Sequence, residues 1–312
     1  FRVQAAETVD VVAGVTEGAN YVSDPLRLDD ALATCREVVK VRAGNFYWGL
    51  RLLPEPKRSA LYALYAWMRA ADDLVDDCVD SEHARRQLDA FGARTQEILS
   101  GGVVPESGED AMWIGLSWLK SEWDIPHEPF SEMLRGQSDD LSSRVIQTSD
   151  DLIEYCQMVA STVGVLCISI WGYSDPLAVE LAVQRGIALQ LTNILRDVGE
   201  DAAQGRCYIP MDALGSRGLD PASLASWGQP VACEAVLRVW IDKARSCYVQ
   251  SAPLEDMVSA DCRKTLRAMT AIYSALLDRI ERDPARCCHI PGVRLSKLSK
   301  VWIALRACRA KP

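Results

Sequence analysis

The stretch QLTNILRDVGED, residues 190–201, changes character along its length and decides how the chain is interpreted. On a helical wheel at about 100° per residue, its polar side chains extend an apolar stripe that starts further upstream. The members of this stripe, in chain order, are Val179, Val183, Gly186, Gln190, Asp197 and Asp201. Asn193 lies about 60° to one side of the stripe. The pattern predicts a helix whose core-facing side ends in amide and carboxylate groups.

A second acidic run, RAADDLVDD at residues 69–77, repeats this arrangement on another predicted helix. The residues that share its core-facing stripe, within about 80°, are Leu61, Tyr65, Met68, Asp72 and Asp76. Asp73 and Asp77 lie about 100° further round, and Arg69 lies beside the stripe. The alternative is a solvated acidic surface, but carboxylates on a buried stripe are costly without a cation partner. An EF-hand is excluded because its alternating ligands and central Gly are missing.

The spacing of these carboxylates suits a metal-dependent reaction on a phosphate. Side chains at i and i+4 lie about 6 Å apart on one helix face, close enough to bracket Mg²⁺ ions. Two such patches that face each other across a helical bundle can hold several Mg²⁺ ions around a diphosphate. Arg69, Arg196 and Arg206 are candidates to share the phosphate charge, and ordinary surface ion pairs are the alternative for each.

A third polar feature is YCQMVASTVG at residues 155–164. Tyr155 shares a helix stripe with Val159 and Thr162, which predicts an inward-facing hydroxyl on an apolar face. Small residues nearby, including Gly164, allow a neighbouring helix or a ligand chain to approach closely. The alternative is a core tyrosine whose hydroxyl is satisfied by the protein itself.

The helical period covers nearly the whole chain after residue 28, with short breaks that contain Pro or Gly. The helices that it predicts are 29–42, 56–77, 81–100, 109–123, 128–137, 149–172, 176–202, 221–226, 232–252, 255–283 and 295–310. Residues 1–28 show no such period and are expected to form a loose leader or lid. The sequence therefore predicts a single all-α domain over residues 29–312.

Composition excludes several classes of protein. The 312 residues carry a net charge of −9, so nucleic acid is not an expected partner. The 11 Cys show no C-x-x-C spacing and are expected to be reduced core thiols of a cytoplasmic protein. The three His are scattered, which disfavours a zinc site. The longest apolar stretch, residues 163–173, is shorter than the roughly 20 residues of a membrane span.

At these motifs the sequence resembles the squalene/phytoene synthases, which are head-to-head prenyl synthases. The resemblance covers nearly the whole chain from about residue 35. It rests on Arg69 with 72–77, on 155–164, on 193–210 and on 46–54, which precedes the first acidic motif. Two positions depart from the family pattern: Ala43 and Asn45 stand where hydroxyl residues are usual, and Val145-Ile146 replaces an expected aromatic residue.

The resemblance implies an all-α fold of the class I isoprenoid synthase type with a central apolar cavity. It implies that two prenyl diphosphates condense, with Mg²⁺ or Mn²⁺, through a cyclopropylcarbinyl diphosphate. The metal ligands that it implies are Asp72, Asp76, Asn193, Asp197 and Asp201. The substrate-binding residues that it implies are Arg69, Gln190, Asn193, Arg206, Tyr273, Asn45 and Phe46, and it places Tyr155 and Tyr273 near the reacting carbons or the leaving diphosphate.

The segment 197–201 looks most like phytoene synthases, which use geranylgeranyl diphosphate. A C30 relative that uses farnesyl diphosphate, namely a squalene, presqualene diphosphate or dehydrosqualene synthase, is the alternative. A non-catalytic helical interaction protein is less favoured because all four inward aspartates are present, and a terpene cyclase is disfavoured by 155–164 and by the second acidic motif. No NADPH is expected, since no G-x-G-x-x-G follows a strand.

The apolar product leads us to expect a cytoplasmic enzyme that docks reversibly on membranes. Residues 1–28 and the basic segment 294–311 are the expected contacts, because basic residues interleaved with an apolar face suit anionic lipid. The alternative is that 294–311 is simply the last core helix.

Overall fold

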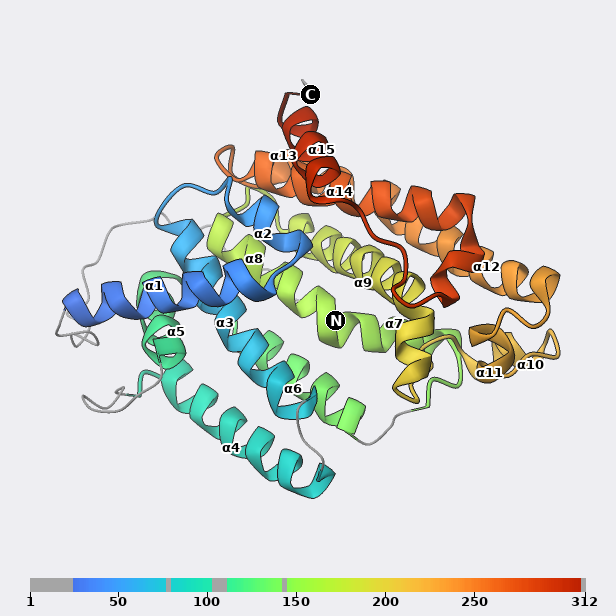
Figure 1. The fold of residues 1–312 in the computed structure, drawn as a ribbon. Helices are drawn as coiled ribbons and strands as arrows, with labels where there is room; N and C mark the ends of the chain where they lie inside the picture. Colours follow the sequence, from blue (N-terminus) through green and yellow to red (C-terminus); the bar gives the residue numbers. More distant parts are fainter. Residues whose placement is uncertain (1–24, 77–79, 103–110, 142–144, 310–312) are drawn as a thin grey trace.

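The computed structural model describes residues 25–76, 80–102, 111–141 and 145–309, and this part of the chain is helical with no strand (Figure 1). The elements are α1 (Pro25–Arg42), α2 (Asn45–Leu50), α3 (Lys57–Asp76), α4 (Ser81–Leu99), α5 (Ala111–Glu122), α6 (Glu128–Leu141), α7 (Ser149–Cys156), the π-helical turn η1 (Gln157–Ser161), α8 (Thr162–Trp171), α9 (Leu177–Ala203), α10 (Met211–Gly215), α11 (Pro221–Ala225), α12 (Pro230–Gln250), α13 (Leu254–Met257), α14 (Arg263–Arg282), the 3-10 turn η2 (Pro284–Cys288) and α15 (Lys297–Arg309). The predicted all-α class is confirmed.

Three differences from the predicted helices have physical reasons. Helix α1 begins at Pro25, inside the expected leader, because proline suits the first helical position; the rest of that leader, residues 1–24, lies outside the described residues. Helix α2 was not predicted, since its six residues between Gly44 and Pro54 are too few to show a period. The single helix predicted over 255–283 is broken, because Val258 is extended and pairs with Tyr173.

A fourth difference matters for the site. Helix α6 was expected to end at Gln137 but continues to Leu141. The extra turn carries Asp139 and Asp140 along the helix, so two carboxylates that the period had left in a loop become helical.

Helix α9 lies between the two halves of the molecule (Figure 1). It packs against α8 and η1 on one side and against α12 and α14 on the other. The elements α1, α4, α5 and α6 surround α3 to form a core around Trp67 and Phe130, whose rings meet edge to face 4.8 Å apart. A second core around Leu237 and Trp240 joins α12 and α14 to α9. The long helices α3 and α9 therefore each lie within a packed core.

The elements α7, η1 and α8 form one continuous helical stretch from Ser149 to Trp171, which is long and apolar enough to cross a membrane by length and composition. A helix over 149–172 was predicted, but not one long and apolar enough to span a membrane, because the uninterrupted apolar run covers only 163–173. Here the stretch packs against α6 and α9, as core helices do. Gly186 of α9 makes the contact close, since a Cβ there would lie 2.5 Å from the Ser161 Cα. The prediction that small residues in 155–164 permit close helix packing is confirmed at this point.

The ten cysteines in the described residues are all free, and seven of them are buried. They pack as small apolar side chains, and burial raises the pKa of the Cys167 thiol to about 12. The expectation that the cysteines are core thiols is confirmed for those seven.

Candidate functional site

An apolar cavity lies among α2, α3, η1, α8, α9, α13 and α14, with an empty volume of about 730 Å³ counting its open mouth. Three of the residues predicted to bind substrate line it: Phe46, Gln190 and Asn193. Its two ends differ in burial. Trp171, Ala182 and Leu254 at one end are no more than 3% exposed, whereas Met68, Gln190 and Asn193 at the other end are half-buried. The cavity is therefore closed at one end and opens where the two acidic motifs begin.

The first acidic motif stands at this mouth. Asp72 follows Met68 by one turn of α3, and its side chain is 34% exposed. The amide of Gln137 on α6 donates a hydrogen bond to the Asp72 carboxylate at 2.5 Å, and Arg69 lies 3.9 Å from the same group. The prediction of a buried stripe is therefore wrong at its last turn, because the stripe ends in an open mouth rather than in the core.

The neighbouring carboxylates of α3 differ from Asp72. Asp73 is held by two cations, Arg69 of its own helix and Arg42 of α1, the latter at 2.7 Å. This pairing ties α3 to α1, as expected of a residue off the inward stripe. Asp76 ends α3, and its side chain lies outside the described residues, as does all of Asp77.

The second acidic motif is more deeply set. Asp197 follows Asn193 by one turn of α9, and its side chain is only 18% exposed. Arg196 donates to it at 2.7 Å, and Arg294 from the segment before α15 donates at 2.9 Å. Burial alone would raise the pKa of Asp197, but the hydrogen bonds and charges of Arg196 and Arg294 hold it below its ordinary value. Arg294 also pairs with Glu200 at 2.5 Å.

Asp201, one turn further on, has the opposite electrostatic environment. Burial, and then the negative charge of Asp197, raise its pKa to about 7. The carbonyl oxygen Oδ1 of Asn193 is buried and accepts no hydrogen bond from the described part of the chain. The buried Oδ1 of Asn193 and the carboxylate of Asp201, whose negative charge is disfavoured, lie on the same end of α9, and both would be stabilised by a bound cation.

Tyr155 does not line the cavity. It is 5% exposed and donates a hydrogen bond at 3.1 Å to Asp140 of α6, which also accepts one at 3.3 Å from Tyr208. The two tyrosine rings stack 4.9 Å apart. Burial and the charge of Asp140 raise the pKa of Tyr155 well above its ordinary value. Its hydroxyl is therefore a fixed, neutral donor that links α7 to the end of α6.

The remaining predicted residues fall into two places. Tyr273 of α14 is buried, and its ring lies 5.6 Å from that of Phe46, so these two predicted residues meet near the cavity. Arg206 follows α9 and, with Asp140 and Tyr208, lines an open groove beside the second motif. Asn45 is the first residue of α2, and its side chain lies outside the described residues.

The oxygen ligands fit a divalent metal, although no group of three or more acidic, His or Cys side chains is assembled for one among the described residues. Mg²⁺ prefers carboxylate and amide oxygens and keeps room for water and phosphate. Such oxygens come from Asp72, Asn193, Asp197 and Asp201. Of these, the Oδ1 atom of Asn193 is buried and accepts no hydrogen bond within the described residues, so it can serve as a metal ligand. A mouth with this chemistry can hold a diphosphate through metal ions while its hydrocarbon tail enters the cavity.

Three residues near the two motifs were not among the predicted site residues. Gln137 lies at the end of the predicted helix 128–137, and Asp140 lies on the turn of α6 beyond it, although the run QSDD at 137–140 resembles the other acidic runs. Arg294 had been assigned to a basic tail, but its contacts with Asp197 and Glu200 place it at the second motif. No local pattern could have revealed that contact, because it joins residues almost one hundred positions apart.

Comparison with known proteins identifies the family of the chain. The squalene/phytoene synthase family matches residues 39–300. A phytoene synthase of Arthrospira platensis is 32% identical over 272 residues, which are 83% of this chain and 86% of that protein. A phytoene synthase of Mycobacterium bovis is 33% identical over 90% of this chain and 91% of its own length. Among solved structures, a dehydrosqualene synthase in complex with ligand superposes with a TM-score of 0.77 at 27% identity, covering 90% of this chain and 96% of that one.

Proposed function

The chain belongs to the squalene/phytoene synthase family, and we propose that it is a phytoene synthase, which joins two molecules of geranylgeranyl diphosphate head to head. The observation that carries the proposal is the apolar cavity lined at one end by Met68 and Asn193, which precede Asp72 and Asp197 by one helical turn each. The polar mouth of this cavity suits a diphosphate, and its apolar interior suits a prenyl tail. Curated phytoene synthases resemble the chain over most of both lengths, which supports the C40 product.

The metal ligands in this proposal are Asp72, Asn193, Asp197 and Asp201, with Asp76 as a fifth candidate from the end of α3. Bound Mg²⁺ supplies positive charge that stabilises the departing diphosphate. The chain adds cations of its own: Arg69 lies beside Asp72, and Arg196 and Arg294 contact Asp197. Once metal ions neutralise Asp197, these guanidinium groups are in place to bind diphosphate oxygens.

The reaction needs no reductant in this form. One allylic diphosphate loses its diphosphate, its C1 alkylates the double bond of the second substrate, and a proton is lost to give the cyclopropylcarbinyl diphosphate. That intermediate loses its diphosphate, rearranges and loses another proton, so two diphosphates and two protons leave per hydrocarbon formed. The buried walls of the cavity exclude the water that would otherwise capture the cations. We therefore propose that NADPH takes no part.

The test supplies the purified protein with C15 or C20 prenyl diphosphate and Mg²⁺, with and without NADPH, and identifies the hydrocarbon by gas chromatography with mass spectrometry. We expect phytoene from the C20 substrate, with no effect of NADPH. A C30 hydrocarbon as the main product would favour the second candidate, a C30 synthase. That candidate has the superposition on a dehydrosqualene synthase in its favour.

Reversible membrane docking in the cytoplasm is the second part of the proposal, because release of the product into water is unfavourable by about 0.8 kcal/mol per CH₂. Helix α15 packs on α14, as a core helix would, yet Leu298, Trp302 and Leu305 on its outer face are exposed, and Arg306 lies over the Trp302 ring. This face combines apolar and basic side chains, which suits an anionic lipid surface. Arg294 does not belong to it, because it is paired with Asp197 and Glu200.

A flotation assay with anionic lipid vesicles tests this part. The double variant Leu298→Ser/Trp302→Ser should remain at the bottom of the gradient while wild type floats, and the exposed Val239→Ser of α12 is the control that should float. If the double variant is folded and floats as well as wild type, α15 is only a structural helix.

A further inference from the structure

The wall of the apolar cavity contains one fully buried guanidinium, that of Arg185. This residue of α9 lines the cavity and is 3% exposed. The other cavity residues near it, Trp171, Ala182 and Leu254, are apolar. Burying a cation costs folding free energy unless each of its donors has an acceptor, so the Arg185 guanidinium must be well paired to lie in this wall.

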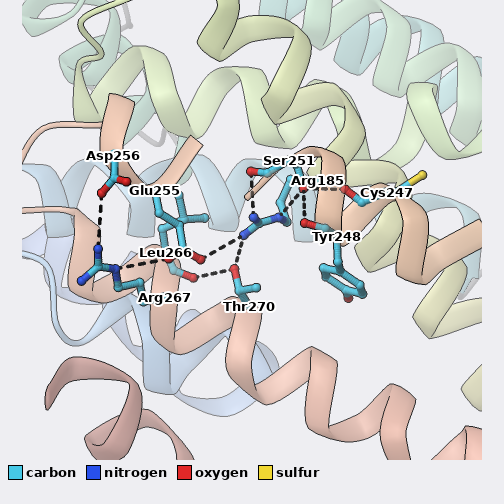
Figure 2. Close-up of polar contacts among 9 residues, drawn as sticks. All are labelled: Arg185, Cys247, Tyr248, Ser251, Glu255, Asp256, Leu266, Arg267 and Thr270. Carbon is cyan, nitrogen blue, oxygen red and sulfur yellow. Dashed lines mark hydrogen bonds and ion pairs between the residues drawn. The ribbon is translucent and has the colours of Figure 1, made fainter. Parts of the chain in front are cut away.

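Four groups of three residues hold the Arg185 guanidinium, as Figure 2 shows. Its Nε donates to the Ser251 hydroxyl at 2.8 Å and one terminal nitrogen donates to the Ser251 carbonyl at 2.9 Å. The other terminal nitrogen contacts the Thr270 hydroxyl and lies 3.7 Å from the Glu255 carboxylate. The guanidinium also lies 6.0 Å from the centre of the Tyr248 ring.

These partners come from different elements, so Arg185 joins α9 to the end of α12, to α13 and to α14. Ser251 is itself fully buried and donates to the Cys247 carbonyl at 2.7 Å. Glu255 is shared with Arg267, which lies 3.2 Å away on the outer side of the network. A Leu or Met in the same wall could change rotamer around a ligand, but a guanidinium fixed by this many hydrogen bonds cannot move without losing them.

The position of Arg185 along the cavity is equally specific. It precedes Asn193 by eight residues of continuous helix, which places it about 12 Å deeper along α9 than the polar mouth. Ala182, three residues further along α9, and Leu254 also line the cavity, so its inner end lies beyond Arg185. The inner part of a prenyl tail whose diphosphate sits at the mouth would therefore run along this wall.

We propose that Arg185 is a specificity-determining residue: its immobilised side chain forms a fixed side wall in the inner half of the apolar cavity and limits the length of the prenyl tail that binds. The inference deepens the proposed function, on which it rests for the orientation of the tail. Because the wall is held by hydrogen bonds rather than by loose apolar packing, it sets a sharp limit.

The test measures binding of unreactive thiolodiphosphate analogues with C15, C20 and C25 tails, in the presence of Mg²⁺, by calorimetry. Arg185→Ala opens the wall, and we expect its affinity for the C25 analogue relative to the C20 analogue to rise by at least about tenfold over wild type. Arg185→Met fills the same space without the hydrogen bonds, so its more mobile side chain should also raise the ratio, but by less than Arg185→Ala does. Arg267→Ala is the matched control, because it removes a cation from the same network but not from the cavity wall, and it should keep the wild-type ratio.

Arg185→Val is made alongside Arg185→Ala, since it shortens the wall while it retains a larger apolar side chain. The proposal is overturned if folded Ala or Val variants keep the wild-type ratio, if Arg185→Met keeps it, or if Arg267→Ala shifts it as far as Arg185→Ala does. Failure of the proposed function looks different: wild type would then form no head-to-head hydrocarbon from C15 or C20 diphosphate, whereas the order of analogue affinities would still report on the wall.

Discussion

The two acidic helix ends at the mouth of the cavity carry similar motifs but hold their carboxylates in different ways. At the end of α3, Asp72 is about a third exposed and is bound by the neutral amide of Gln137. At the end of α9, Asp197 is largely buried and is neutralised by Arg196 and Arg294. Arg69 lies 3.9 Å from Asp72, further than the two arginines lie from Asp197, so water contributes more to charge compensation at the first patch than at the second. Changes that treat the two patches alike should therefore have different consequences for stability.

Removal of divalent metal is expected to have the largest effect on activity, because both acidic patches depend on it. A chelator should abolish product formation, because the diphosphate would meet the carboxylates of both motifs without an intervening cation. Mg²⁺ or Mn²⁺ should restore it, while the far-ultraviolet circular dichroism stays the same throughout. Full activity in the presence of excess chelator would contradict the role given to Asp72 and Asp197.

Single carboxylate-to-amide changes sharpen the comparison. Asp72→Asn and Asp197→Asn should each lower the rate by more than about a hundredfold, because each removes a metal ligand. Their effects on stability should differ. Asp197→Asn leaves Arg196 with a weaker partner in a buried place and should cost about 1–3 kcal/mol, whereas Asp72→Asn should change stability by less than about 0.5 kcal/mol.

Two measurements test these variants: steady-state rates in the presence of Mg²⁺, and thermal denaturation of the metal-free proteins. Asp73→Asn serves as the control for activity and should be milder, since Asp73 pairs with Arg42 and Arg69 rather than facing the mouth. If Asp72→Asn and Asp197→Asn both keep more than about a tenth of the wild-type rate, the two-patch metal site is wrong.

A change to Gln137, whose amide binds Asp72, should have a smaller effect on activity that is confined to the first patch. Gln137→Leu removes the hydrogen bond that orients this carboxylate, and loss of such a partner typically weakens metal binding by about tenfold to a hundredfold. We expect a higher Mg²⁺ concentration for half-maximal activity with little change in the maximal rate. Gln96→Leu, whose amide binds Ser131 away from the mouth, is the control and should match wild type. An unchanged Mg²⁺ requirement in Gln137→Leu would remove Gln137 from the site.

The same contrast between the patches explains how far the sequence could lead. The stripes on α3 and α9 predicted which face of each helix turns toward the cavity, because a helical period is local information. The lining residues Gln190 and Asn193 and the helix ends that carry Asp72 and Asp197 followed from it. The roles of these residues remain predictions that the experiments above address.

What the period could not supply are contacts between distant segments. Arg294 reaches Asp197 across the fold, Gln137 reaches Asp72 from another helix, and Asp140 sits on a turn of α6 beyond the predicted helix end. The same holds for Arg185: its place on the helix was predictable, but its partners on α12, α13 and α14 were not. A buried cation looks, in sequence, like any other arginine.

The smallest expected effect concerns Asp201, and it runs in the opposite direction to that of Asp197. The folded-state pKa of Asp201 is raised to about 7, so the folded metal-free protein binds this proton more tightly than the unfolded chain does. The stability contributed by the proton is complete below the unfolded pKa and is lost as the pH rises through about 7. Asp201→Asn, which mimics the protonated group, should therefore stabilise the metal-free protein by a few degrees in melting temperature at pH 8, and by less at pH 5.

Asp197 has a lowered pKa, so its contribution to stability is present at neutral pH and is lost as the pH falls through the folded-state value. Asp197→Asn should destabilise the protein at pH 8 and less so in acid. Thermal denaturation of both variants and wild type in chelator, from pH 5 to pH 8, separates the two. If Asp201→Asn and Asp197→Asn shift the melting temperature in the same direction at pH 8, the electrostatic difference within the second patch does not exist.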